Sequence, residues 1–214
     1  MKIVNYEKKH FSQLLPVLQK TWNFSKFFPE AESPRFVYEL VLESVLSGPL
    51  NHTQIVENDE GKAVGCLVGT IKKNVTTTHK VKAVLDIGKL IVKTLYKILI
   101  GKFGPIGEVF ERLKEIGSLI GNLERDKAKF DGVVELFILD ESLRGKGLGK
   151  RMMNTFVSEC KQEGAKSITL WTDRGCTFEF YDKYGFEMHR KIHSPILSFP
   201  ECSENGFVYK FTIS

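Results

Sequence analysis

The chain has 214 residues, of which 42% are hydrophobic and 27% charged, a composition typical of a globular protein with one good-sized core. Its 31 basic and 26 acidic residues give a net charge of +5, which favours an anionic partner but is too weak and too scattered for a nucleic-acid-binding protein. The four cysteines form no C-x-x-C pair and the N-terminus carries no signal-peptide pattern, so neither a metal site nor secretion is indicated. We therefore expect a cytoplasmic protein that binds no nucleic acid and no metal.

The N-terminal part of the chain is predicted to begin in the order strand, helix, helix, strand, strand. Apolar residues recur at helical spacing in two segments, and a turn-rich aromatic stretch, residues 22–35, lies between them. Two strand-like runs then meet at Glu60-Gly61, a pair typical of a hairpin turn. The predicted elements are a strand at 2–6, helices at 11–22 and 36–45, and a hairpin at 53–72.

A long insert, residues 74–130, is predicted to form a helical hairpin. Its first helix, near 81–100, carries five charged residues at spacings of 4, 3, 4 and 4, which places Lys82, Asp86, Lys89, Lys93 and Lys97 on one stripe. Five charges argue against a membrane-spanning segment. We expect the lysines to face solvent, and the apolar remainder to be buried against the second helix at 109–123, the sheet or another subunit.

The C-terminal part is predicted to alternate strands and helices before it ends in two strands. An apolar run at 131–139 and the segment "SITLWT" are strand-like, and helical patterns follow each of them. Gly164 and Gly185 stand where helix ends need a left-handed residue. The element order predicts an α/β domain that spans residues 1–214 and carries the hairpin as an insertion.

A glycine-rich loop joins the strand at 131–139 to the helix that follows it. The loop reads Arg-Gly-Lys-Gly-Leu-Gly over residues 144–149, and it matches neither the Walker nor the dinucleotide spacing. Glycines at 145, 147 and 149 allow backbone N–H groups to converge on an anion at the positive end of the helix. The loop therefore predicts a pyrophosphate site, although a tight surface turn would have similar residues.

The loop in its strand-loop-helix setting resembles the acetyl-CoA signature of the GNAT superfamily of N-acetyltransferases. A second segment, "FEFYDKYGF" at 178–186, is similar to the family's later motif, a helix that carries a tyrosine and ends in Gly-Phe. The resemblance covers the element order of the chain outside the insert. It implies a mixed, mainly antiparallel sheet of about seven strands flanked by helices, and acetyl-CoA as acyl donor.

The resemblance also implies roles for individual residues. The tyrosine of the second motif, Tyr181, would protonate the leaving thiolate, and the strand before the loop would hydrogen-bond the pantetheine. Arg174 and Thr177 are expected to contact CoA only because they stand at the start of the second helix. The chain departs from the family there, since "TDRGCT" replaces a segment in which an asparagine is common. The implied acetyl-CoA contacts are Phe137, Ile138, Leu139, Arg144, Gly145, Lys146, Gly147, Leu148, Gly149, Lys150, Arg174 and Thr177.

Acyl transfer to an amine needs a proton donor for sulfur and a proton acceptor for nitrogen. A tyrosine, with an ordinary pKa of about 10, stays protonated at neutral pH, although Tyr181 also fits a purely structural core position. Glu135 is a candidate general base on the face of its strand expected to hold Phe137 and Leu139, with a water chain as the alternative. Cys176 is better explained as a small buried residue than as a nucleophile.

These features predict an N-acetyltransferase that passes the acetyl group directly to a primary amine of a small molecule or a protein. The acceptor has no recognisable sequence code, and we expect the hairpin to form a wall or lid of its pocket. Two alternatives stay open: a non-catalytic acyl-CoA-binding module, and a protein that docks on a membrane or partner through the hairpin. A homodimer also stays open, whereas a solvated face is the favoured interpretation of the lysine stripe.

Overall fold

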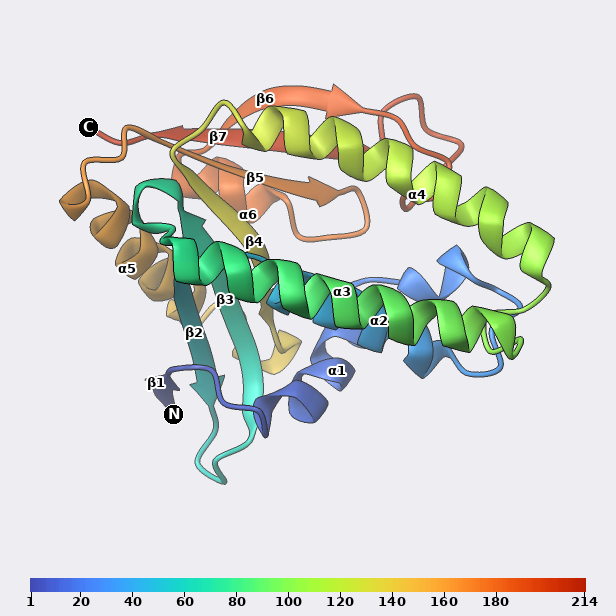
Figure 1. The fold of residues 1–214 in the computed structure, drawn as a ribbon. Helices are drawn as coiled ribbons and strands as arrows, with labels where there is room; N and C mark the ends of the chain where they lie inside the picture. The colour runs from blue at the N-terminus through green and yellow to red at the C-terminus, as the bar shows by residue number, and fades with distance from the viewer.

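The computed structural model describes residues 1–214, and its seven strands form one sheet in the order β1-β2-β3-β4-β5-β7-β6. All neighbours are antiparallel except β4 and β5, which are parallel. The predicted mixed, mainly antiparallel sheet is therefore confirmed (Figure 1). The strands are β1 Lys2–Val4, β2 His52–Glu57, β3 Ala63–Ile71, β4 Gly132–Leu139, β5 Ser167–Asp173, β6 Glu187–Ile192 and β7 Gly206–Thr212.

Six α-helices flank the sheet, and they include the two predicted for the insert between β3 and β4. Three short 3₁₀ helices, η1 Phe24–Phe27, η2 Lys72–Asn74 and η3 Glu141–Leu143, lie in the connections. None of the helices combines the length and apolar character that a membrane crossing needs. The α-helices are α1 His10–Thr21, α2 Pro34–Leu46, α3 Thr77–Leu99, α4 Ile106–Lys127, α5 Leu148–Gln162 and α6 Glu179–Tyr184.

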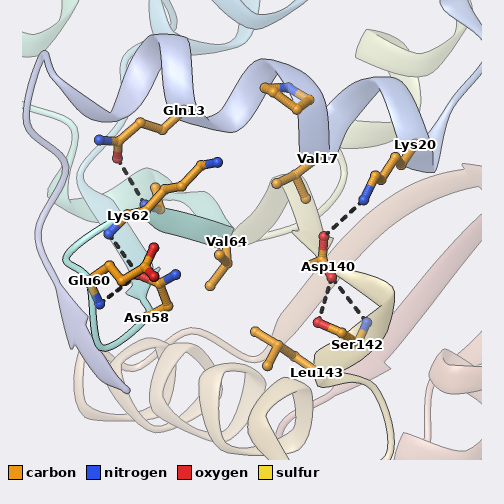
Figure 2. A pocket seen from close by; sticks show the side chains of 12 residues that line it. Gln13, Val17, Lys20, Asn58, Glu60, Lys62, Val64, Asp140, Ser142 and Leu143 are labelled. Carbon is orange, nitrogen blue, oxygen red and sulfur yellow. Dashed lines mark hydrogen bonds and ion pairs between the residues drawn. The ribbon is translucent and has the colours of Figure 1, made fainter.

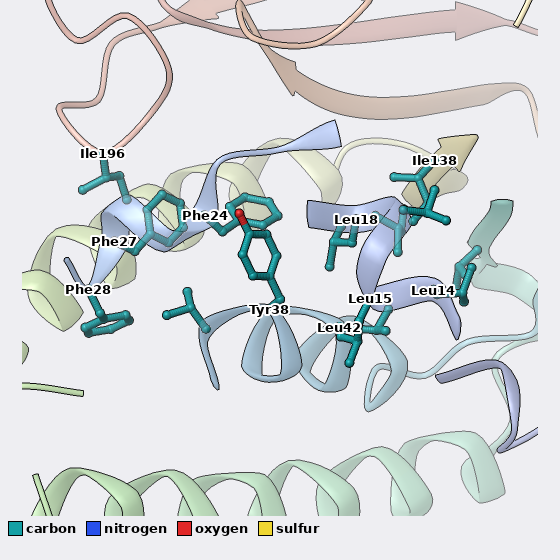
Figure 3. Packing of buried hydrophobic residues seen from close by; sticks show 14 of the residues in the cluster. Leu14, Leu15, Leu18, Phe24, Phe27, Phe28, Tyr38, Leu42, Ile138 and Ile196 are labelled. Carbon is teal, nitrogen blue, oxygen red and sulfur yellow. The ribbon is translucent and has the colours of Figure 1, made fainter. Parts of the chain in front are cut away.

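Two hydrophobic clusters pack on the sheet, one beneath α1, α2 and α4 and the other beneath α5 and α6. In the first cluster, Tyr38 and Leu42 of α2 point toward α1 and the aromatic η1 segment (Figure 3). In the second, Phe156 of α5 lies so close to Gly69 of β3 that a Cβ there would stand 2.7 Å from its ring. A glycine at 69 thus allows α5 to pack tightly on the sheet.

The two parallel strands in the middle of the sheet, β4 and β5, are paired only at their N-terminal ends and then separate. Only Gly132↔Ile168 and Val133↔Thr169 pair across β4 and β5, although the strands have 8 and 7 residues. A β-bulge interrupts β4 just beyond this point, because Val68 and Gly69 of β3 pair with Leu136 and Val134. The C-terminal half of β4 therefore has no strand partner on its β5 side.

The structure corrects the predicted burial of the apolar part of α3. Lys97 is only 18% exposed and pairs with Glu39 of α2 at 3.4 Å, and Lys93 pairs with Glu43 of the same helix at 2.5 Å. The apolar face points outward instead, and Leu99 is 74% exposed. The predicted solvent exposure of the lysine stripe was wrong at Lys97, which Glu39 of α2 attracts inward, whereas Lys82, Lys89 and Lys93 are exposed.

The second helix of the insert, α4, packs its apolar seam into the core. Its residues Val109, Leu119 and Leu123 belong to the cluster beneath α1 and α2. Asp126, which is buried, accepts a hydrogen bond from Arg190 of β6 at 2.8 Å, so α4 is also tied to the far edge of the sheet. Figure 1 shows α4 running alongside β5, β6 and β7, whereas α3 lies on the outside of α2.

Candidate active site

The glycine loop presents a continuous row of free backbone donors at the start of α5. Gly145 and Gly147 both have φ of +75°, a conformation in which most residues with a side chain are strained. The backbone N–H groups of residues 145–150 have no acceptor in the protein, and no side chain caps α5. They lie at the positive end of a 15-residue helix, a setting that binds phosphate groups.

Basic side chains surround the loop, and one of them, Arg144, links the loop to the segment just before α6. Arg144 donates a hydrogen bond to the hydroxyl of Thr177 at 3.3 Å, so these two residues come together. Lys146 and Lys150 are exposed at the loop. Arg174 points elsewhere: its guanidinium donates to the carbonyl of Glu204 at 3.1 and 3.2 Å, and its contact with CoA stays a prediction.

The segment that leads into the loop is fixed by Asp140, the residue after β4. Its carboxylate accepts hydrogen bonds from the backbone N–H and hydroxyl of Ser142 at 3.1 and 2.7 Å, and it faces Lys20 of α1 at 3.6 Å. The Ser142 hydrogen bonds hold the pKa of Asp140 below its ordinary value. A pocket of about 300 Å³ lies beside this anchor, between α1 and the turn from β2 to β3 (Figure 2).

An aromatic layer lies between the loop and the opening of the sheet. The rings of Phe137 on β4 and Phe180 on α6 have centroids 5.6 Å apart, and both lie about 3.4 Å from where a Cβ of Gly149 would stand. The sequence therefore brings the predicted strand and loop residues into contact. A chain that enters from the loop toward the β4–β5 opening would run beside these rings.

Tyr181 lies in the same layer, on the one full turn of helix before Gly185. Its ring packs against Phe180, Phe186 and Tyr209, and it is buried. Burial raises the pKa of the phenol above its ordinary value of 10.0, so the hydroxyl keeps its proton. No hydrogen bond within the protein engages this hydroxyl, which can therefore donate to a ligand.

Glu135 occupies the β-bulge of β4 and is held by a lysine of the insert. Lys127 Nζ lies 2.7 Å from Glu135 Oε2 and 2.8 Å from Glu124. Burial lowers the pKa of Lys127, but the two carboxylates outweigh it and the net pKa is raised. The ammonium is therefore charged and faces an acidic pair.

The structure corrects the predicted face of Glu135. Phe137 and Leu139 pack into the cluster beneath α5 and α6, whereas Glu135 pairs with α4 on the other side of the sheet. The bulge is the physical reason, because it breaks the alternation of side chains along β4. Sequence reasoning missed Lys127 altogether, since nothing in the pattern of the insert pairs its last residue with the next strand.

The cysteines are not placed as nucleophiles. Burial raises the pKa of the Cys176 thiol, and that of the Cys66 and Cys160 thiols to about 12. Nowhere do three His, Cys, Asp or Glu side chains gather as a metal-ligand set. The chemistry that the arrangement supports is anion binding at the loop and proton donation by a phenol.

Known proteins share both the loop segment and the fold. The model of the acetyltransferase (GNAT) family matches residues 108–186, which run from α4 through the loop to the end of α6. Among solved structures, a putative GNAT acetyltransferase from Desulfovibrio desulfuricans has a TM-score of 0.53 and 10% identity over 100% of this chain and 99% of its own. No curated protein sequence matches.

Two further structures with the same fold are enzymes of named activity. The ribosomal-protein-S18-alanine N-acetyltransferase from Escherichia coli has a TM-score of 0.54 and 11% identity, over 100% of this chain and 94% of its own. An aminoglycoside 6'-N-acetyltransferase complexed with coenzyme A has a TM-score of 0.53 and 14% identity, over 100% and 98%. The chain thus matches the GNAT acetyltransferase family over residues 108–186, and its fold is that of solved structures of this kind.

Proposed function

We propose that the protein is an N-acetyltransferase that transfers the acetyl group of acetyl-CoA directly to a primary amine. The observation that carries the proposal is the row of free N–H groups over residues 145–150 at the positive end of α5. Such donors suit a pyrophosphate, with Arg144, Lys146 and Lys150 adding positive charge around it. Residues 1–214 would form one acyltransferase domain with the hairpin at 74–130 as an insertion.

The open side of β4 suits the pantetheine arm. Beyond Val133 no residue of β4 is paired with β5, so the peptide groups of Phe137, Ile138 and Leu139 can hydrogen-bond a ligand that lies between the strands. The same edge would polarise the thioester carbonyl through a backbone N–H near Leu139. The thioester would then lie on the sheet side of the aromatic layer.

In the transfer step, the amine nitrogen forms a bond to the carbonyl carbon and the carbon–sulfur bond breaks. The departing thiolate takes the proton of Tyr181, which the raised pKa of that phenol keeps in place until sulfur becomes basic. The nitrogen loses its proton to Glu135, directly or through water. Lys127 Nζ, 2.7 Å from Glu135 Oε2, would hold this carboxylate in position.

Of the two helices of the insert, α4 and not α3 would line the pocket that binds the acceptor amine. Lys127 reaches Glu135, and Asp126 joins Arg190 of β6, so the C-terminal end of α4 spans β4 and β6. We infer that this end forms a wall of the acceptor pocket. The acceptor is a primary amine of a small molecule or of a protein, and the two structural relatives described above, a ribosomal-protein and an aminoglycoside N-acetyltransferase, include one of each kind.

The proposal is tested by the rate of CoA release from acetyl-CoA with an amine panel that contains polyamines, aminoglycosides and peptide N-termini. Tyr181→Phe is expected to lower kcat by about 10²-fold with little change in acetyl-CoA affinity, because the proton matters only as sulfur departs. Tyr184→Phe is the matched control, since its hydroxyl lies on the same helix but donates to Asn154. Glu135→Gln should lower the rate most where the acceptor is still an ammonium ion, because only then is a proton acceptor needed.

Two results would contradict the proposal. Unchanged turnover in the Tyr181→Phe variant would assign the proton donor to another group. Tight acetyl-CoA binding with no acetyl transfer to any amine of the panel, in the folded protein, would favour a non-catalytic acyl-CoA-binding module.

A further inference from the structure

The outward face of α3 is the most apolar exposed surface of the molecule. Of the 16 large hydrophobic residues that are exposed, nine lie on this helix, which has only 23 of the 214 residues. Val84, Val92 and Leu99 are 71%, 68% and 74% exposed. The nine, which we call the α3 face, are Val81, Val84, Leu85, Ile87, Ile91, Val92, Leu95, Tyr96 and Leu99.

The α3 face is continuous along the helix and wide. At 100° per residue, all of its members except Ile87 fall within about 140° of the circumference. The helix is about 34 Å long, at 1.5 Å for each residue. A surface of this size is far larger than the scattered exposed residues of an ordinary monomer, and it marks a place where the protein meets something apolar.

The charge of the molecule is concentrated around the same helix. Residues 72–102 contain eight lysines and one acidic residue, a net charge of +7. Three of the lysines pair with Glu32, Glu39 and Glu43, which leaves a net charge of +4 around the helix. The one acid, Asp86, faces Lys89 at 3.2 Å. By helical position, Lys82 and Lys89 border the α3 face on one side and Lys80 borders it on the other.

We propose that the α3 face docks in the plane of an anionic lipid bilayer. A helix with a wide apolar face bordered by lysines lies in the interface, where the apolar side chains enter the acyl boundary and the ammonium groups meet lipid phosphates. The charge pattern favours this surface over a second copy of the chain. In an antiparallel two-fold pairing the row of Lys82 and Lys89 would meet its own copy, and like charges would repel.

The way α3 is held supports the same assignment. Lys93 and Lys97 fasten the helix to Glu43 and Glu39, so the docking side is turned outward while α2 anchors the other side. Lys97 also lies over the ring of Phe36 at 4.3 Å. The helix therefore needs no refolding to present its apolar face, and the sheet and its glycine loop stay intact behind it.

The test is flotation of the full chain with vesicles of phosphatidylcholine alone and of phosphatidylcholine with phosphatidylserine. We expect binding only to the anionic vesicles, weakened at high salt. The triple variant Val84→Ser, Val92→Ser, Leu99→Ser should bind at least about tenfold more weakly. Its control carries serine at Ile106, Phe110 and Ile120, which are exposed on α4, and should bind like the parent protein.

A second pair of variants separates charge at this helix from charge elsewhere. Lys82→Gln with Lys89→Gln should weaken binding by about fivefold per lysine, because each loses its attraction to the anionic surface. Lys166→Gln with Lys183→Gln changes the net charge equally on exposed positions near β5 and α6 and should have little effect.

Two outcomes would overturn the proposal. One is no flotation of the folded protein with anionic vesicles at any lipid concentration. The other is a stable dimer of the parent protein that the triple serine variant dissociates, since a second copy would then cover the α3 face. All of these variants leave the glycine loop unchanged, so acetyl-CoA binding serves as a check of folding.

Discussion

Two amphipathic helices of this protein, α5 and α3, are placed in opposite ways on the same fold. In α5, Met152, Met153, Phe156 and Cys160 are fully buried against the sheet while its basic residues stay outside. In α3, Lys93 and Lys97 pair with glutamates of α2 and the apolar face points outward. The comparison shows that an amphipathic pattern defines two faces without defining which of them the neighbouring element will cover.

The neighbours explain the difference. β3 offers α5 an apolar surface with Gly69, where the ring of Phe156 can come close. α2 offers α3 a surface that contains Glu39 and Glu43, and carboxylates attract ammonium groups more strongly than they accommodate valines. What looks like one pattern in the sequence thus leads to a buried core in one helix and an exposed surface in the other.

The largest expected effect is on the free energy of unfolding, when one apolar side chain is truncated in each of the two helices. Phe156→Ala should lower the free energy of unfolding by about 3–5 kcal/mol, because it leaves a cavity above Gly69. Val92→Ala on α3 should change it by less than about 0.5 kcal/mol, since the side chain is already exposed. Urea unfolding measures both. Equal losses in the two variants would mean that α3 buries its apolar face as α5 does.

A smaller effect concerns pH, because α3 is held to α2 by carboxylates. Burial works to raise the pKa of Glu39, but Arg35 and Lys97 outweigh it and the net pKa lies below the ordinary 4.5. A lowered pKa means that the contact stabilises the fold above about pH 4.5 and is lost as the pH falls through the folded-state value. The pair is partly exposed, so we expect about 1 kcal/mol or less.

The readout is the amide-exchange protection of α3 relative to α5 between pH 6 and pH 3. Protection of α3 should fall first, and Glu39→Gln should reproduce much of that loss at pH 6. Glu111→Gln, on an exposed glutamate of α4, is the control. Parallel loss of protection in the two helices would show that α3 is not held by its acidic contacts.

The sequence predicted elements better than it predicted contacts. The helix ends at Gly164 and Gly185 were predicted because turn chemistry is local: both glycines have the positive φ expected of them. The contact of Lys127 with Glu135 was not predicted, because it depends on the position of the C-terminal end of α4 relative to the sheet. It also depends on a β-bulge in β4 for which the sequence of the strand gives no signal. The ion pairs of Lys93 and Lys97 were missed for the same reason, since their partners on α2 lie 50 and 58 residues away.

The central claim, that the loop at 144–150 holds the pyrophosphate of acetyl-CoA, is tested most directly by titration calorimetry on two variants of Gly147. Asparagine and aspartate both tolerate the left-handed backbone of this position and have nearly the same shape, but only aspartate adds negative charge. We predict that Gly147→Asn keeps measurable acetyl-CoA binding and that Gly147→Asp loses it. Equal affinity in the two folded variants would contradict the claim.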